Sequence, residues 1–408
     1  MSYGLYRYGF FAGALAFAGL PLYIHAPKFF VDEYGLSLTS IGLLLLALRA
    51  IDFFQDPFIG IGLDRFRSVR KAVAFIAAII MAIAMLLLFV FDAAGNPRLW
   101  FGISMILLFT AYSTLTIMFY DQGIAKADAL GENGHIQVAQ WRESGALVGV
   151  CVAAVLPSIF AAMNWLAPMT AFAATFVGIM LFAAFLMRHE WQTSNKEVLP
   201  GTNIIGDPIL RRLLIIALLN AAPVAVTSNL FLFFVEYRLG SATAAGPFLL
   251  LFFLAAAASV PTWGRVAKEW GIKRTMVFGM ILAIVTFGFA LFLGTGDLAL
   301  FAIVCVASGA ALGADMTLLP AAFARHLDKT STAGGRGFGL WNFCAKFMLA
   351  FAAATVLPSL EFAGFSTNST NSEAALWSLS LLYAGLPCAL KVVALALILT
   401  TQFEEQTS

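Results

Sequence analysis

Long apolar runs separated by short polar segments fill almost the whole chain. Their approximate limits are residues 8–27, 39–62, 72–91, 98–122, 139–162, 167–187, 210–235, 245–268, 274–294, 297–324, 337–358 and 375–402. A helix rises about 1.5 Å per residue, so about 20 apolar residues cross the roughly 30 Å hydrocarbon core of a bilayer. The pattern predicts an all-α membrane protein with twelve transmembrane helices.

The composition excludes an ordinary soluble domain. Of the 408 residues, 61% are hydrophobic and only 11% are charged, whereas a soluble domain carries about 25% charged residues. The net charge of +2 indicates no particular partner. We therefore expect the lipid bilayer and a small solute as partners, and no nucleic acid.

The cysteines and histidines give no sign of a catalytic or metal site. The four cysteines lie in four different apolar runs, which predicts reduced, buried thiols. The four histidines lack metal-ligand spacing, and no HExxH, GxSxG or P-loop motif occurs. We expect a protein that is not an enzyme and that holds no cofactor, and we expect it to be a monomer.

Basic residues are distributed unevenly between the two sets of loops. If the N-terminus is cytoplasmic, only Lys28, Arg98 and Arg238 fall on the outer side, and the other loop lysines and arginines fall on the cytoplasmic side. Cytoplasmic loops are enriched in Lys and Arg. The bias predicts a multi-pass protein of the inner or plasma membrane, with both termini in the cytoplasm and residues 361–374 outside.

The chain divides into two halves of equal length. Gly60 and Arg70 recur as Gly264 and Arg274, an offset of 204 residues, which is half of 408. Many transporters are built from two such six-helix repeats. The predicted parts are an N-terminal six-helix bundle (1–187), a central cytoplasmic loop (188–209) and a C-terminal six-helix bundle (210–408).

The second apolar run contains three charged residues. Arg49, Asp52 and Asp56 stand at positions i, i+3 and i+7, so they share one helix face. A charge at mid-bilayer costs about 2.5–3.5 kcal/mol on insertion scales, so this face must meet protein or a wet cavity. One reading is an internal ion pair with Arg49. The other is a cation site, because two acids against one base leave a carboxylate that needs a counter-ion.

Several motifs resemble a known transporter family. Residues 60–71, GIGLDRFRSVRK, are similar to the signature between helices two and three of the major facilitator superfamily. Residues 48–57, the pair Trp141-Arg142 and residues 337–346 resemble the glycoside–pentoside–hexuronide:cation symporters within it. The resemblance implies the major facilitator fold and cation-coupled symport of a sugar, a glycoside or a similar small polar solute by alternating access.

The same resemblance implies a cation site that binds Na⁺ or H⁺. Its residues are Asp52, Asp56, Ser113 and Thr116. Thr116 is a departure, because the sugar permease of this family has an aspartate there, and residues 9–16 lack the family's other sugar-binding carboxylate. A proton-coupled transporter of a non-sugar solute, such as an organic acid or an amphiphilic lipid, therefore stays open. A membrane sensor or enzyme on the same scaffold is a more distant alternative.

Other polar residues in the apolar runs are candidates for binding solute or gating the cavity. They are Arg49, Arg142, Lys346, Tyr112, Tyr120, Trp341, Asn342 and Asp315. Arg142 and Lys346 are 204 residues apart and occupy equivalent repeat positions. We expect a carboxylate of the second span to hold Lys346, because a lone ammonium there is costly. Glu143 points about 100° away from Arg142 on a helix, which assigns it to a helix interface.

The loop after the second span is a candidate conformational element. Its residues are Gly60, Asp64, Arg65 and Arg70. In the wider superfamily, the charges of this loop bridge helix ends in the outward-facing state, and the resemblance implies the same role here. The alternative is a set of solvated charges that only enforce topology. Asp121 is expected to cap a helix or pair with a base at the membrane surface.

Overall fold

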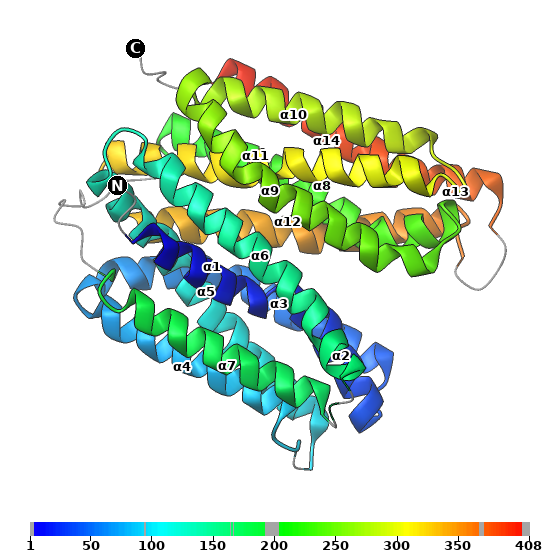
Figure 1. The fold of residues 1–408 in the computed structure, drawn as a ribbon, viewed down its shortest axis with the longest axis horizontal. Coiled ribbons are helices and arrows are strands. Elements are labelled where there is room, and N and C mark those ends of the chain that lie inside the picture. The colour runs from blue at the N-terminus through cyan, green and yellow to red at the C-terminus, as the bar shows by residue number, and fades with distance from the viewer. Residues whose placement is uncertain are drawn as a thin grey trace. The chain divides into compact units, whose positions relative to one another are not determined.

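The chain folds almost entirely into helices, as the sequence predicts (Figure 1). The computed structural model describes residues 4–93, 95–163, 165, 167–191, 204–366 and 371–401. Within these ranges there is no strand. Most of the predicted central loop 188–209 lies outside the described residues.

The chain forms two compact units, Met1–Thr202 with Leu327–Phe343, and Asn203–His326 with Cys344–Ser408. The first residues of the helix Gly334–Phe362 therefore group with the first unit, while the rest of that helix belongs to the second. Leu327–Phe343 is the one segment of the second half of the chain that groups with the first unit. The two sequential bundles, 1–187 and 210–408, stay a prediction.

Seven helices of the first unit follow one another along the chain. They are α1 (Leu5–Ala18), α2 (Leu20–Tyr34), α3 (Leu38–Arg65), α4 (Arg70–Phe89), α5 (Pro97–Ala129), α6 (Gly134–Ala162) and α7 (Pro168–Met187), with a 3₁₀ turn η1 (Arg67–Val69) before α4. The first predicted span is not one continuous helix, because the chain breaks at Gly19 between α1 and α2.

The second unit contains the remaining helices. They are α8 (Pro208–Phe233), α9 (Ala245–Trp270), α10 (Ile272–Gly288), α11 (Leu298–Lys329, except its last three residues), α13 (Glu373–Ser380) and α14 (Leu386–Thr400), and α12 (Gly334–Phe362) continues into this unit. Short turns extend several of them: η2 (Phe234–Arg238), η3 (Ala242–Ala244), η4 (Phe289–Phe292) and η5 (Leu381–Gly385).

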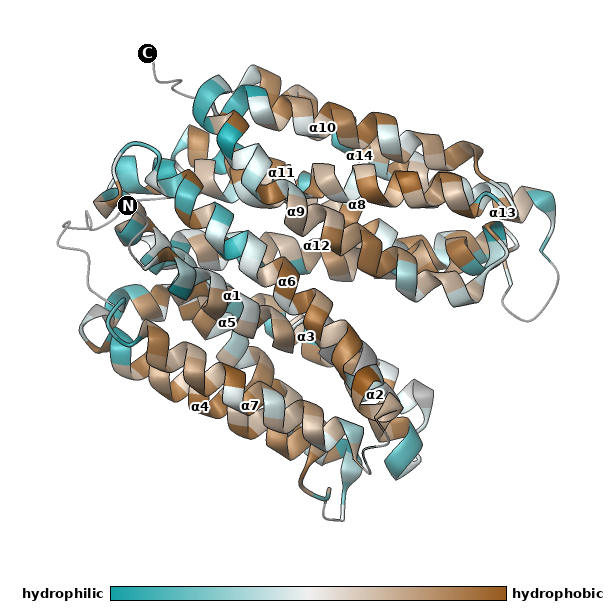
Figure 2. Cartoon of the chain, viewed as in Figure 1, coloured by the Kyte–Doolittle hydropathy of each residue, from teal (hydrophilic) through white to brown (hydrophobic). Residues whose placement is uncertain are grey.

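Hydropathy along the helices agrees with a membrane protein. In Figure 2, apolar residues cover the long helices and hydrophilic residues gather toward their ends. Ten helical segments among the described residues are long and apolar enough to cross a membrane. The ten do not include α1 and α2, which correspond to the first predicted span, or α3, which corresponds to the second. A count of twelve spans stays a prediction.

Side-chain caps fix where several helices begin. The hydroxyl of Ser37 accepts from the Ser40 N–H at the start of α3, and Asn96 Oδ1 accepts from the Leu99 N–H at the start of α5, both at 3.2 Å. These bonds satisfy donors that a helix start leaves open. Each cap therefore stabilises the start of its helix through residues within three positions of each other.

Asp207 caps α8 in the same way. Its Oδ1 accepts from the N–H groups of Ile209 and Leu210 at 2.8 and 2.9 Å, and Oδ2 lies 3.3 Å from His326 Nε2. Burial favours a higher pKa for Asp207, but the backbone hydrogen bonds and His326 outweigh it and lower the pKa. This cap therefore stabilises the fold above the ordinary pKa of an aspartate and is lost as pH falls through the lowered value.

Glycines allow α1 and α6 to approach closely. A Cβ on Gly145 would overlap the backbone of Gly9, and a Cβ on Gly149 would overlap the backbone of Gly13. Small residues spaced by four along both helices let their backbones touch, a common packing in membranes. No larger side chain fits at these crossings.

The α1–α6 contact gives a test of the fold. We expect Gly145→Val to destabilise the protein by about 1–3 kcal/mol or more, because the new side chain must displace the Gly9 backbone. The measurement is the thermal melting of purified protein in detergent. Gly178→Val is the matched control, because a Cβ there meets nothing within 4 Å. Equal melting temperatures for the two variants would contradict the observed packing.

Candidate functional site

Two aspartates of α3 are buried in the first unit. The exposed fraction is 3% for Asp52 and 0% for Asp56. Arg49, one turn before Asp52, is half-buried. A charged carboxylate is strongly disfavoured in so dry a place unless hydrogen bonds or an opposite charge compensate it. The neighbours of these two acids therefore decide what the site can bind.

Asp52 is joined to α5 through a small polar network. The Ser113 hydroxyl donates to Asp52 Oδ1 at 3.2 Å, and Gln55 Nε2 donates to the same oxygen at 3.2 Å. Thr110 of α5 in turn donates to Gln55 Oε1 at 3.0 Å. The structure thus brings together Asp52 and Ser113, one predicted ligand from each helix, and adds Gln55 and Thr110, which the sequence analysis missed.

The other two predicted cation ligands lie further along the same helices. Asp56 follows Asp52 by one turn of α3, and Thr116 follows Ser113 by three residues of α5. The Thr116 hydroxyl oxygen is buried and has no hydrogen-bond partner among the described residues. Carboxylate and hydroxyl oxygens suit hard cations or a proton. In the part of the chain that the structure describes, no group of three or more His, Cys, Asp or Glu residues could hold a metal ion.

A second buried cluster surrounds Arg142 of α6. Its Nε donates to Glu143 Oε1 at 2.7 Å, and its guanidinium carbon lies 3.7 Å from the centre of the Tyr120 ring. The Tyr120 hydroxyl also donates to Glu143 Oε1, at 3.3 Å. The prediction that Glu143 turns away from Arg142 is wrong, because adjacent side chains on a helix can bend toward each other when both are long. Glu143 is thus a polar residue of this cluster.

The predicted conformational loop meets the start of α12 inside the first unit. The N–H groups of Gly335 and Arg336 donate to the Asp64 carboxylate at 3.2 and 2.8 Å. A carboxylate at a helix N-terminus caps open donors and interacts favourably with the helix dipole. A Cβ on Gly60 would overlap the Gly335 backbone, so glycine is needed there. Arg65, in contrast, is exposed.

Asp121 lies at the same helix start. A Cβ on Gly334, the first residue of α12, would overlap its carboxylate. Asp121 also forms an ion pair with Arg70, the first residue of α4, and both side chains are buried. The expected pairing of Asp121 is therefore present, but it is buried and not at a solvated surface.

The remaining candidates are spread over both units. Tyr112 lies on α5, and Trp341 and Asn342 lie on the part of α12 that belongs to the first unit. The Phe338 ring of α12 packs against Tyr120 at 4.9 Å between ring centres. Lys346 and Asp315 belong to the second unit. The expected pairing of Lys346 with an acid of α3 stays a prediction.

Comparison with protein families identifies the chain. The profile of the family described as MFS/sugar transport protein matches residues 5–405. The chain belongs to this family. Membership agrees with the resemblance to the major facilitator superfamily and makes the protein a multi-pass membrane transporter of a small-molecule substrate. A comparison with curated proteins gave no match.

Solved transporters share the fold. One is a bacterial homologue of the iron transporter ferroportin in an outward-facing state, 15% identical with a TM-score of 0.70, covering 96% of this chain and 99% of that one. Another is the Escherichia coli fucose:proton symporter FucP (N162A), 13% identical with a TM-score of 0.67, covering 98% of both chains. At such low identity these likenesses establish the major facilitator fold alone.

The contact between Asp64 and α12 can be tested by substitution. We expect Asp64→Ala to lower the free energy of unfolding by about 0.5–2 kcal/mol, since two N–H groups lose their acceptor. Asp64→Asn keeps one acceptor oxygen, so its melting temperature should lie between those of Asp64→Ala and the parent protein. Glu132→Ala, at an exposed position of the α5–α6 loop, is the control. A loss no larger than that of the control would show that the cap contributes nothing.

Proposed function

We propose that the protein is a secondary active transporter that couples the movement of a cation to symport of a sugar, a glycoside or a similar small polar solute by alternating access. It works as a monomer in the inner or plasma membrane, with both termini in the cytoplasm. The observation that carries the proposal is Asp52, a carboxylate buried on α3 and hydrogen-bonded to Ser113 of α5.

A buried carboxylate is suited to bind and release a cation. The cost of keeping the charge dry falls when a proton or Na⁺ neutralises it, so the state of the site depends on the cation gradient. Asp56 and the hydroxyls of Ser113 and Thr116 supply further oxygens on the same two helices.

Coupling needs no covalent chemistry. If cation and solute each bind the occluded state more tightly than the open states, their joint binding lowers a barrier that neither lowers alone. The contacts of Asp64 and Asp121 at the start of α12 supply a conformational element that can form in one state and break in another. The family's description as sugar transport and the proton-coupled fucose symporter of the same fold support this reading.

Thr116 favours a second candidate, proton-coupled transport of a non-sugar solute. The sugar permease that the chain resembles has an aspartate at this position. Without that carboxylate, the site has one fewer negative charge to hold Na⁺ and lacks an acid that contacts the sugar in that permease. The two candidate functions differ in the gradient that drives uptake, Na⁺ or pH, and in the solute that is taken up, and the uptake experiment below measures both.

Substitution of the two acids tests the cation site. We expect Asp52→Asn or Asp56→Asn to abolish concentrative uptake, because the charge is lost while the side-chain volume is kept, and to leave some exchange of solute. The measurement is uptake into proteoliposomes of labelled sugars, glycosides and organic acids under imposed Na⁺ or pH gradients. Glu132→Gln is the matched control. Full gradient-driven uptake by the Asp52→Asn, Asp56→Asn double variant would end the cation-site proposal.

Topology can be tested separately. In a variant without the four native cysteines, we expect Glu361→Cys to react with an impermeant thiol reagent added to intact cells. We expect Asn195→Cys, in the central loop, to react only after the membrane is opened, because the basic loops are cytoplasmic. Labelling of position 195 in intact cells would contradict the predicted orientation.

A further inference from the structure

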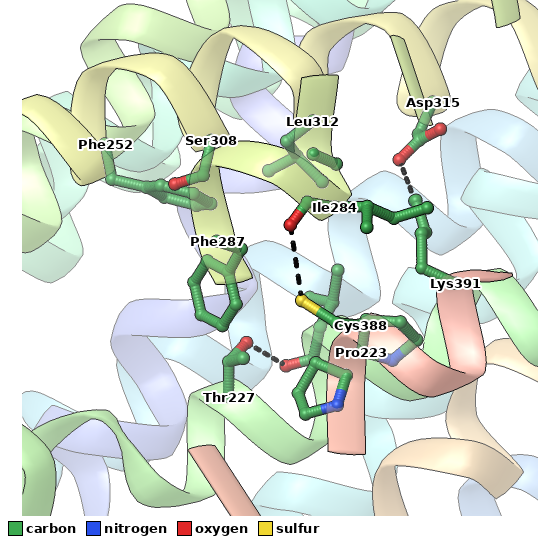
Figure 3. Close-up of a pocket in the computed structure, with 13 residues that line it drawn as sticks. Pro223, Thr227, Phe252, Ile284, Phe287, Ser308, Leu312, Asp315, Cys388 and Lys391 are labelled. Atoms are coloured by element: carbon green, nitrogen blue, oxygen red, sulfur yellow. Dashed lines mark hydrogen bonds and ion pairs between the residues drawn. The ribbon is translucent and has the colours of Figure 1, made fainter. Parts of the chain in front are cut away.

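The second unit contains a cavity that the proposed cation site does not use. Its volume is about 70 Å³, and its walls come from α8, α9, α10, α11 and α14 (Figure 3). This volume exceeds the roughly 10–15 Å³ that one water molecule needs. The cavity therefore has room for part of a small solute.

A compensated ion pair forms one end of the cavity. Lys391 of α14 donates to Asp315 Oδ2 of α11 and to Asn220 Oδ1 of α8. Both charged side chains are more than nine-tenths buried, at 7% and 6% exposure. The pair is seen at the upper right of Figure 3, joined by a dashed line. Its net charge is zero, so neither ion needs a further counter-ion.

The pair still has unused hydrogen-bonding capacity. A lysine ammonium has three N–H donors, and the described residues accept two of those of Lys391. Asp315 Oδ1 is buried and has no hydrogen-bond partner among the described residues. A buried polar atom without a partner costs free energy that a bound donor or acceptor would recover.

The rest of the cavity is largely apolar. Phe252, Ile284, Phe287 and Leu312 line it, together with two hydroxyl groups and one thiol. The hydroxyls of Thr227 and Ser308 donate to carbonyl oxygens of their own helices, which leaves their oxygens as acceptors. Cavities that combine apolar walls with a few polar groups are typical binding sites for small molecules.

We infer that this cavity binds a small neutral solute that carries hydroxyl groups on an apolar body. A hydroxyl both donates and accepts, so it can use the spare capacity of the pair without breaking the pair. An anionic solute would compete with Asp315 for Lys391, and a cationic solute would compete with Lys391 for Asp315. Each of these leaves one buried charge uncompensated. The site goes beyond the proposed cation coupling and binds whether or not Asp52 takes up a cation.

Cys388 provides a reporter inside the cavity. It lines the wall, and its thiol lies 3.5 Å from the Ile284 carbonyl oxygen (Figure 3). The test protein keeps Cys388 and carries serine at the other three cysteines, Cys151, Cys305 and Cys344. The measurement is the rate at which N-ethylmaleimide labels Cys388 of the full chain in lipid nanodiscs.

The probes are three phenoxy compounds with different head groups. 3-Phenoxypropane-1,2-diol is neutral, phenoxyacetate is an anion and 2-phenoxyethylamine is a cation at neutral pH. At about ten times its dissociation constant, the diol should slow labelling about tenfold, because only about one site in eleven stays empty. The anion and the cation should protect far less at the same concentration. Equal protection by all three, or none by the diol, would overturn the inference.

Neutralising the ion pair tests which groups recognise the solute. The double variant Asp315→Asn, Lys391→Gln keeps the volume and the zero net charge, and we expect protection by the diol to fall to that of the charged probes. The matched control is Arg238→Gln, Glu373→Gln, which neutralises an ion pair of the same unit outside the cavity. Unchanged protection in the Asp315, Lys391 double variant would exclude recognition by the pair.

A second measurement, thermal melting with each probe, tests the site even if the double variant does not fold or the Cys388 thiol does not react. The diol should raise the melting temperature of the parent protein more than phenoxyacetate or 2-phenoxyethylamine does, and no such difference would contradict the site. Asp52→Asn should leave the protection of Cys388 unchanged. Full gradient-driven uptake by Asp52→Asn would contradict the cation site alone, and loss of Cys388 protection in this variant would contradict the independent solute site alone.

Discussion

The cost of burying charge governs the arrangement of this protein. Each buried charged cluster described above includes residues of more than one helix, and each finds compensation within its own unit. Asp52 is hydrogen-bonded to Ser113, Arg142 to Glu143, Arg70 to Asp121, and Lys391 to Asp315. A single uncompensated charge in such a place is strongly destabilising, so these groups fix which helices can lie together.

Close backbone contacts depend on a different constraint, the absence of a side chain. Gly145 and Gly149 let α6 lie against α1, and Gly60 and Gly335 let α3 lie against the start of α12. Apolar burial does not drive helices together in lipid as it does in water, so such contacts and the polar clusters carry much of the packing. The glycine contacts determine how closely two helices approach, and the polar clusters determine which helix faces meet.

The sequence predicted the helices and the class of protein because hydropathy is a local signal. The caps at Ser37 and Asn96 follow from residues within three positions, and the acids of α3 are visible as charges in an apolar run. The meeting of Asp64 with Arg336, 272 residues later, could not be predicted from local patterns. Glu143 was misplaced because ideal helix angles ignore side-chain length, and the break at Gly19 was missed because one glycine in an apolar run is a weak signal.

Two helices, α3 and α5, carry both the proposed cation ligands and the aspartates that contact the start of α12. On α3, Asp64 follows Asp52 by twelve residues, a rise of about 18 Å, and on α5, Asp121 follows Ser113 by eight residues, a rise of about 12 Å. A helix that tilts or bends when its ligand binds moves its far end as well. Pro57 lies inside α3 between the two sites and lacks the N–H that would complete the helix there, so bending can concentrate at that point. The two helices thus form a direct physical connection between the proposed cation site and the contact at the start of α12.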